Sequence, residues 1–126
     1  IFLADAPEVI RKKVMRAVTD SGPTEPNQPK PDSIKNLFSL MDLVSAPETV
    51  SHFQDAYNKC TIRYGDMKKQ LAEDMVQFIK PIREKAADLL ANTDELHRII
   101  KQGADKGRAR ASETLTMVRN AVGLNY

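Results

Sequence analysis

The sequence predicts an all-α fold of about five helices packed as an antiparallel bundle. Three observations lead to this prediction. Apolar residues recur at spacings of three and four along most of the chain, as they do on one face of a helix. Residues that favour helix ends stand at both ends of these segments. No segment alternates apolar and polar residues between turn signals, which is the pattern of a strand.

The first helix is expected to begin at Asp5, where Asp5 and Glu8 form a capping box and Pro7 falls in the first turn. Gly22 is its expected stop. Its apolar face is formed by Ile10, Val14 and Ala17. Four of the seven prolines fall within residues 22–32, and this composition favours an exposed loop because proline interrupts helices.

Two helices are expected next, over residues 33–44 and from Pro47 onward, with a second capping box at Ser45 and Glu48. The apolar face of the helix over 33–44 comprises Ile34, Leu37, Met41 and Val44. That of its successor comprises Val50, Phe53, Tyr57 and Cys60. Cys60 is therefore interpreted as a small core residue.

A long fourth helix is expected from an N-cap at Asp66, and it continues through Pro81 with a kink near Gln77. Its apolar face is Met67, Leu71, Met75, Phe78, Ile82, Ala86 and Leu89. Asn92, with Glu95 three residues on, opens a fifth helix that Gly123 closes. The apolar face of this helix is Ile100, Ala104, Gly107, Ala111, Leu115, Val118 and Val122.

Composition sets limits on the class of protein. The chain has 126 residues, a net charge of +2 and one cysteine, so it holds no internal disulfide. No apolar run reaches the roughly 18 residues that span a bilayer, so no membrane partner is expected. The chain opens on Ile1-Phe2-Leu3 rather than on Met, and we expect it to be a piece of a longer protein.

Catalytic and metal-binding patterns are weak. Cys60 with His52 as a base lacks a third orienting group, and neither His52 nor His97 has a second ligand at metal spacing. Gly103 and Gly107 stand within a predicted helix, where they cannot form a phosphate-binding loop. We therefore expect no catalytic residue, no metal site and no cofactor bound by this segment.

Basic residues are more informative. Between Arg98 and Arg119 there are six Lys or Arg residues and only two acids. Further basic residues gather at 11–16 and at 68–69. Such clusters are either solvated faces or phosphate contacts, which gain affinity by releasing counterions. Tyr64 and Tyr126 are the only candidates for stacking on exposed bases.

Four blocks resemble a known family. Residues 10–21 (IRKKVMRAVTDS) resemble the segment that follows the signature loop of bacterial tryptophan–tRNA ligases. Three later blocks resemble further stretches of that family, in the same order: 64–73 (YGDMKKQLAE), 80–84 (KPIRE) and 103–112 (GADKGRARAS). Each block alone is unspecific, but together they cover most of the chain. The alternatives are the same region of a tyrosine–tRNA ligase and a free-standing helical protein-interaction module.

The resemblance implies the C-terminal helical part of a class I aminoacyl-tRNA synthetase. The complete enzyme would be a cytoplasmic homodimer that uses ATP and Mg²⁺ to attach tryptophan to its tRNA. Residues 1–22 would continue from a missing N-terminal nucleotide-binding domain, 23–32 would form a Pro-rich loop, and 33–126 would form the anticodon-binding domain.

The resemblance also suggests roles for particular residues. Residues that follow the signature loop would couple its closure to the helical domain; these are Lys12, Lys13, Thr19, Asp20 and Ser21. A positive face for the anticodon arm is predicted from the clustered basic residues Lys68, Lys69, Lys101, Lys106, Arg108 and Arg110.

Overall fold

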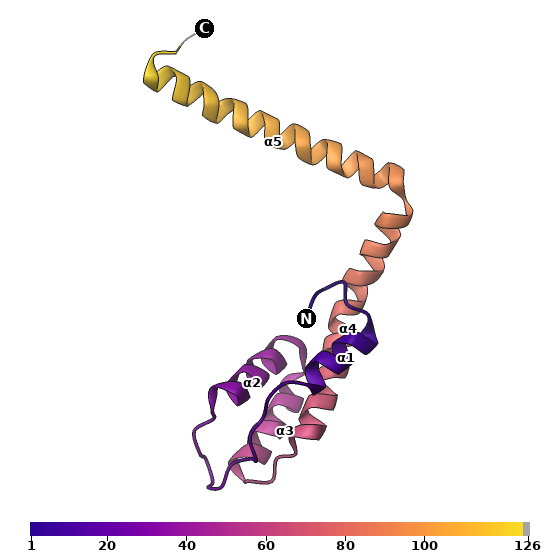
Figure 1. The fold of residues 1–126 in the computed structure, drawn as a ribbon, viewed down its shortest axis with the longest axis vertical. Helices are drawn as coiled ribbons and strands as arrows, with labels where there is room; N and C mark the ends of the chain where they lie inside the picture. The colour runs from indigo at the N-terminus through magenta and orange to yellow at the C-terminus, as the bar shows by residue number, and fades with distance from the viewer. Residues whose placement is uncertain (125–126) are drawn as a thin grey trace. The chain divides into compact units, whose positions relative to one another are not determined.

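The fold is known from a computed structural model that describes residues 1–124, so Tyr126, a stacking candidate, lies outside the described residues. Over this range the chain forms five α-helices and no strand, which confirms the all-α prediction. The helices are α1 (Pro7–Met15), α2 (Asp32–Val44), α3 (Pro47–Asn58), α4 (Tyr64–Ala91) and α5 (Thr93–Val122) (Figure 1). Over the same residues, no helix is long and apolar enough to cross a membrane.

The chain divides into two compact units, Ile1–Arg83 and Glu84–Tyr126, with the boundary inside α4. The Pro-rich loop therefore lies within the first unit. Residues 1–22, predicted to continue from an N-terminal domain, contribute Ile10 and Val14 to a core shared with the helices that follow the loop.

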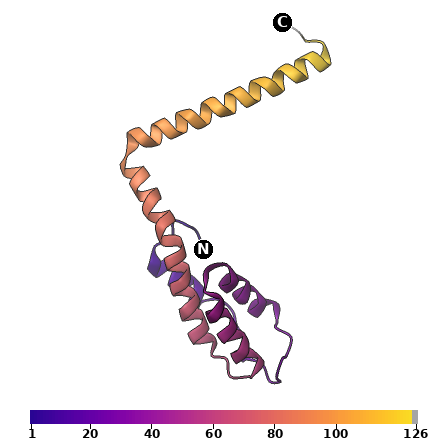
Figure 2. The same cartoon turned by 180° about the vertical axis from the view of Figure 1, so that it is seen from behind.

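The core of the first unit joins four helices: α1 and α3 lie beside the first part of α4, and α2 packs against α3 (Figures 1 and 2). Its centre is fully enclosed: six large side chains, one or more from each helix, are less than 2% exposed. They are Ile10, Ile34, Met41, Tyr57, Met67 and Leu71. The ring of Tyr57 packs edge-on against that of Phe38, with centroids 6.3 Å apart.

The buried face of α4 departs from the predicted one. Met67, Leu71 and Met75 are buried as expected, but Phe78 and Ile82 are 52% and 44% exposed. Their places are taken by Ala72, Val76 and Ile79. The face of α4 that contacts the core is therefore rotated from the predicted face toward the adjacent row of side chains.

Both predicted capping boxes are wrong. Ala6 and Ala46 are the N-caps of α1 and α3, and neither makes a side-chain cap. Asp5 is instead engaged outside the helix, where its carboxylate accepts hydrogen bonds from Lys13 Nζ at 2.6 Å and from the Phe2 amide at 2.8 Å. The prolines in the first turns were placed correctly.

Cys60 does not belong to the core. Helix α3 ends at Asn58, and Cys60 is exposed in a left-handed conformation with φ of 57°. The predicted start of α4 at Asp66 is also late, because α4 begins at Tyr64 and holds Asp66 in its first turn. As predicted, Pro81 lies inside one continuous helix.

The Pro-rich loop is mostly exposed, as predicted, but one side chain ties it to the core. Lys30 Nζ donates a 2.6 Å hydrogen bond to Gln54 Oε1. It also lies 4.6 Å from the ring centroid of Phe38 and 5.0 Å from that of Tyr57. The aromatic faces attract the ammonium, and burial lowers the pKa of Lys30.

Candidate nucleic-acid interface and coupling segment

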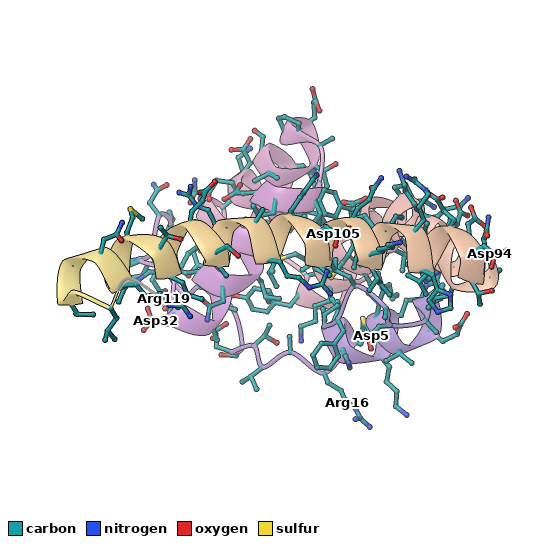
Figure 3. The ribbon with its side chains drawn as sticks, turned by 90° about the horizontal axis from the view of Figure 1, so that it is seen from above. Asp5, Arg16, Asp32, Asp94, Asp105 and Arg119 are labelled. Atoms are coloured by element: carbon teal, nitrogen blue, oxygen red, sulfur yellow. The ribbon has the colours of Figure 1, made fainter. Side chains whose placement is uncertain are left out.

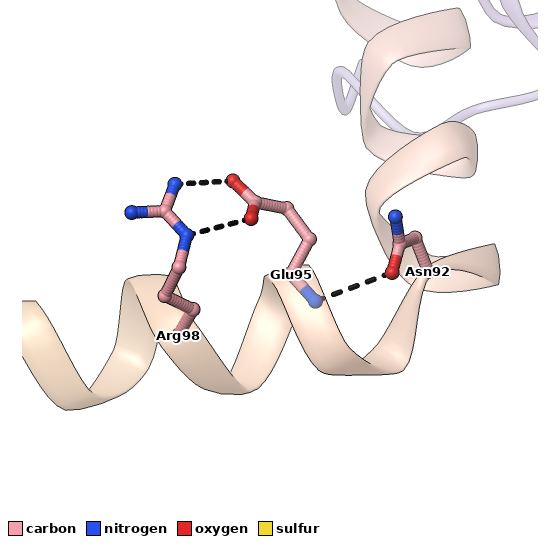
Figure 4. Close-up of polar contacts among 3 residues, drawn as sticks. All are labelled: Asn92, Glu95 and Arg98. Carbon is pink, nitrogen blue, oxygen red and sulfur yellow. Dashed lines mark hydrogen bonds and ion pairs between the residues drawn. The ribbon is translucent and has the colours of Figure 1, made fainter.

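Helix α5 is bounded by the caps that its sequence predicts. The Asn92 side chain accepts a hydrogen bond from the Glu95 amide at 3.2 Å (Figure 4). Glu95 in turn receives two hydrogen bonds from Arg98, at 2.7 and 2.5 Å, and these bonds lower the pKa of Glu95. At the other end, Gly123 takes the left-handed conformation that lets the helix stop.

No residue of α5 is buried. All four of its predicted tRNA-contacting residues are exposed: Lys101, Lys106, Arg108 and Arg110. Asp94, Asp105 and Arg119 mark successive positions along this helix in Figure 3. The helix is amphipathic, and its apolar stripe includes Ile100, Leu115, Val118 and Val122, each more than half exposed.

Two of the four cations form ion pairs with neighbouring acidic residues. Arg108 pairs with Asp105 at 2.7 Å and Arg110 pairs with Glu113 at 3.0 Å, each three residues apart. At about 100° per residue, Lys101 and Arg108 fall on one flank of the apolar stripe, whereas Lys106 lies opposite it. The four cations therefore occupy two faces of α5.

Lys69 and Lys68 belong to the first unit, and their environments differ sharply. The Lys69 side chain is 72% exposed and lies 4.0 Å from Asp66. Lys68 is 8% exposed. Its ammonium donates to the Ala17 carbonyl at 2.7 Å and to Thr19 Oγ1 at 3.1 Å. Lys68 was predicted to contact tRNA; because it is buried and already bonded, we remove it from that surface.

The contact partner of Lys68 is the predicted coupling segment. Thr19 is half-buried against Lys68, and Asp20 accepts a hydrogen bond from the Gly22 amide at 2.8 Å. Asp20 also lies near two tyrosines of the core. Burial first, and then the Asp20 carboxylate, raise the pKa of Tyr64; the same two causes raise that of Tyr57.

Both tyrosine hydroxyls are buried, and neither makes a hydrogen bond of standard geometry with the described residues. The nearby Asp20 carboxylate thus acts on Tyr64 without completing a well-aligned bond. The segment therefore lies over a cluster of two polar contacts: Asp20 lies near Tyr57 and Tyr64, and Thr19 is bonded to Lys68.

The other predicted coupling residues lie apart from this cluster. Lys13 holds the N-terminal turn, where its ammonium pairs with Asp5 and lies 4.7 Å from the Phe2 ring centroid. Lys12 and Ser21 are exposed. The sequence analysis did not predict that Lys68 is buried and bonded within the protein. Its position one residue after Met67, on the edge of the apolar face of α4, is consistent with this burial.

Comparisons with known proteins give the family. The chain is 50% identical to the tryptophan–tRNA ligase of Porphyromonas gingivalis, over 98% of this chain and 38% of the relative. It is 40% identical to that of Enterococcus faecalis and 34% identical to tryptophan–tRNA ligase 1 of Streptomyces coelicolor, in each case over 98% of this chain and 36% of the relative. No protein-family model matches the chain.

The all-helical fold and these matches define the C-terminal helical part of an aminoacyl-tRNA ligase. More specifically, the chain matches the C-terminal part of proteins named tryptophan–tRNA ligase. It spans a little over a third of the length of these relatives. All three relatives are named tryptophan–tRNA ligases, which favours this ligase over the tyrosine–tRNA ligase that the sequence analysis kept as an alternative.

Proposed function

We propose that this chain is the tRNA-contacting C-terminal part of a tryptophan–tRNA ligase, and that the cations on two faces of α5 bind the anticodon arm. The observation that carries the proposal is the exposure of every cation on α5, in a chain whose relatives are named for a tRNA substrate. Lys101 and Lys106 are the leading contacts, one on each of the two charged faces of α5, because Arg108 and Arg110 already pair with acids on the same helix.

The complete ligase would attach tryptophan to its tRNA with ATP and Mg²⁺, as a cytoplasmic homodimer with an N-terminal nucleotide-binding domain. The residues of this chain do not fit the cofactors. Across residues 1–124, no three carboxylate, imidazole or thiol groups gather at metal-binding distance. Gly103 and Gly107 lie inside α5, not in a phosphate-binding loop.

The test of the tRNA surface uses the full-length ligase that contains this chain. The double variant Lys101→Glu/Lys106→Glu should raise the Kd for tryptophan tRNA. It should also flatten the plot of log Kd against log salt, by about 0.7 to 0.9 for each phosphate contact removed. Lys59→Glu, an exposed lysine outside the proposed surface, is the matched control. An unchanged Kd and salt slope in the double variant would refute this surface.

We further infer that Lys12, Lys13, Thr19, Asp20 and Ser21 couple the helical domain to the signature loop of the complete enzyme. What supports this is the resemblance of residues 10–21 to the segment that follows that loop in the family. A rigid connection of this kind could gate loop closure. Thr19→Ala and Asp20→Ala should slow tryptophan-dependent pyrophosphate exchange; normal exchange in both variants would contradict the coupling.

A further inference from the structure

Lys68 is buried in a way that its charge does not explain. Lysine is seldom enclosed without a partner of opposite charge, yet the two partners of its ammonium are a carbonyl and a hydroxyl, both neutral. Lys68 also lies near the N-terminus of α4, where the helix dipole disfavours a cation. Neither attraction between opposite charges nor the dipole of α4 accounts for its position.

The ammonium does find a suitable place at the other helix it touches. Helix α1 ends at Met15, and Ala17 follows directly after its C-cap. The Ala17 amide still bonds to the Val14 carbonyl at 3.0 Å, while the Ala17 carbonyl accepts from Lys68. A cation beside the carbonyl end of a helix is favourable. Lys68 therefore binds the end of α1 to the start of α4, across 51 residues of sequence.

The segment that Lys68 holds has little else to fix it. Residues 17–20 are irregular backbone between α1 and the Pro-rich loop. Val18 is 77% exposed and Asp20 is exposed, so burial restrains this segment only through the half-buried Ala17 and Thr19. The two hydrogen bonds of Lys68 fix the direction of the chain at the point where it leaves α1.

We propose that Lys68 is a positioning residue, which holds residues 17–19 against α4 and thereby sets the rate of tryptophan activation by the complete ligase. This proposal rests on the coupling role proposed above for residues 19–21. Lys68 touches neither substrate nor tRNA in this role. It acts through the geometry of the segment, and Thr19 Oγ1 is the second half of the contact.

The test compares variants of the full-length ligase. Lys68→Met keeps the apolar stem but removes the donors, and Thr19→Val removes only the hydroxyl. We expect each to lower the kcat of tryptophan-dependent pyrophosphate exchange, and Lys68→Met, which removes both hydrogen bonds of the ammonium, to lower it by at least about tenfold. The KM for tryptophan and the Kd for tRNA should change little. Thr19→Ser keeps the hydroxyl, so its kcat should stay near the wild-type value, in contrast to that of Thr19→Val.

Three further measurements make the test specific. Lys85→Met applies the same chemical change to an exposed lysine of α4 and should leave exchange unaltered. Amide hydrogen exchange should quicken at residues 18–20 in Lys68→Met, and the double variant Lys68→Met/Thr19→Val should be little worse than Lys68→Met because the two side chains share one contact. If Lys68→Met fails to fold, Thr19→Val and Thr19→Ser still decide the question.

The outcomes separate this proposal from the proposed function. An exchange kcat within twofold of wild type in folded Lys68→Met, or in Thr19→Val, would overturn the positioning role. Weakened tRNA binding with normal exchange would overturn it too and return Lys68 to the phosphate surface. A full-length wild-type protein that activates no tryptophan would instead refute the proposed function, while faster amide exchange at 18–20 would still report the contact.

Discussion

Arg11 of α1 and Glu73 of α4 are joined by two hydrogen bonds, of 2.6 and 2.9 Å, across 62 residues of sequence. The paired geometry fits the planar guanidinium to the carboxylate. Both side chains are roughly half exposed, at 41% and 52%, so solvent and salt weaken the attraction. The pair therefore fixes how α1 lies along α4 more than it stabilises the fold.

The Arg11–Glu73 pair should respond to acid. Its hydrogen bonds lower the pKa of Glu73, so its contribution to stability is complete above the ordinary glutamate pKa, about 4.3. It is then lost as the pH falls through the lowered pKa of Glu73. A double-mutant cycle with Arg11→Ala and Glu73→Gln should show a small favourable coupling at pH 7 that vanishes at pH 2. A coupling that persists in strong acid would contradict this account.

Tyr64→Phe should make the first unit less sensitive to alkali. Because the pKa of Tyr64 is raised, its share of stability is complete below the ordinary tyrosine pKa of about 10 and declines as the pH rises beyond it. Urea unfolding at pH 7 should show Tyr64→Phe as stable as wild type or more so, since the buried Tyr64 hydroxyl makes no well-aligned hydrogen bond that the variant would lose. Near pH 11 the advantage of the variant should grow. An equal loss in both proteins would exclude Tyr64 as a cause.

Leu71→Ala and Phe78→Ala should differ strongly, although both residues belong to the apolar pattern of α4. Leu71 is 0% exposed and Phe78 is 52% exposed. The Leu71 change should cost about 2–5 kcal/mol of unfolding free energy, because it leaves a cavity in the core. The Phe78 change should stay within about 0.5 kcal/mol in this chain. Denaturant titrations of both variants measure the difference, and equal losses would disprove the observed face of α4.

Asn92→Ala should weaken the start of α5 by about 1 kcal/mol, because the Asn92 side chain caps the Glu95 amide. Asn92→Asp should keep the cap. Ser45→Ala is the comparison, since Ser45 also precedes a capping-box glutamate but makes no side-chain cap to α3. Amide exchange of Glu95 should quicken only in Asn92→Ala. Equal protection in Asn92→Ala and wild type would show that the cap does not hold this end.

Local chemistry explains which elements the sequence could predict. The ends of α5 are determined within a few residues, by the Asn92 side chain and by the left-handed freedom of Gly123, so both were predictable. Asp5 carries the same capping signal, but Lys13 and the Phe2 amide compete for its carboxylate. That competition depends on the path of the chain before α1, which helical periodicity does not encode.

The site was less predictable, because the presence of a lysine in the sequence does not show whether its ammonium is buried against the protein or exposed to a ligand. Lys68 and Lys69 are adjacent and chemically identical, yet one is 8% exposed and the other has a side chain 72% exposed. The difference depends on the return of residues 17–19 to α4, a contact across about 50 positions. The prediction that Cys60 lies in the core was wrong for a similar reason. The spacing of Cys60 from Tyr57 continues the apolar face of α3, but the helix ends before Cys60.

The 30 residues of α5, about 45 Å of helix at 1.5 Å per residue, contribute nothing to the buried core. An uncovered helix in water draws its order only from its own propensity and caps. Calorimetry of this chain should therefore record one cooperative heat-absorption peak, from the first unit, while α5 loses helix gradually and without a peak of its own. Any ligand that favours the helical form of α5 should raise, by mass action, the temperature at which half of this helix is lost. Circular dichroism of α5 can therefore serve as a titration signal for binding.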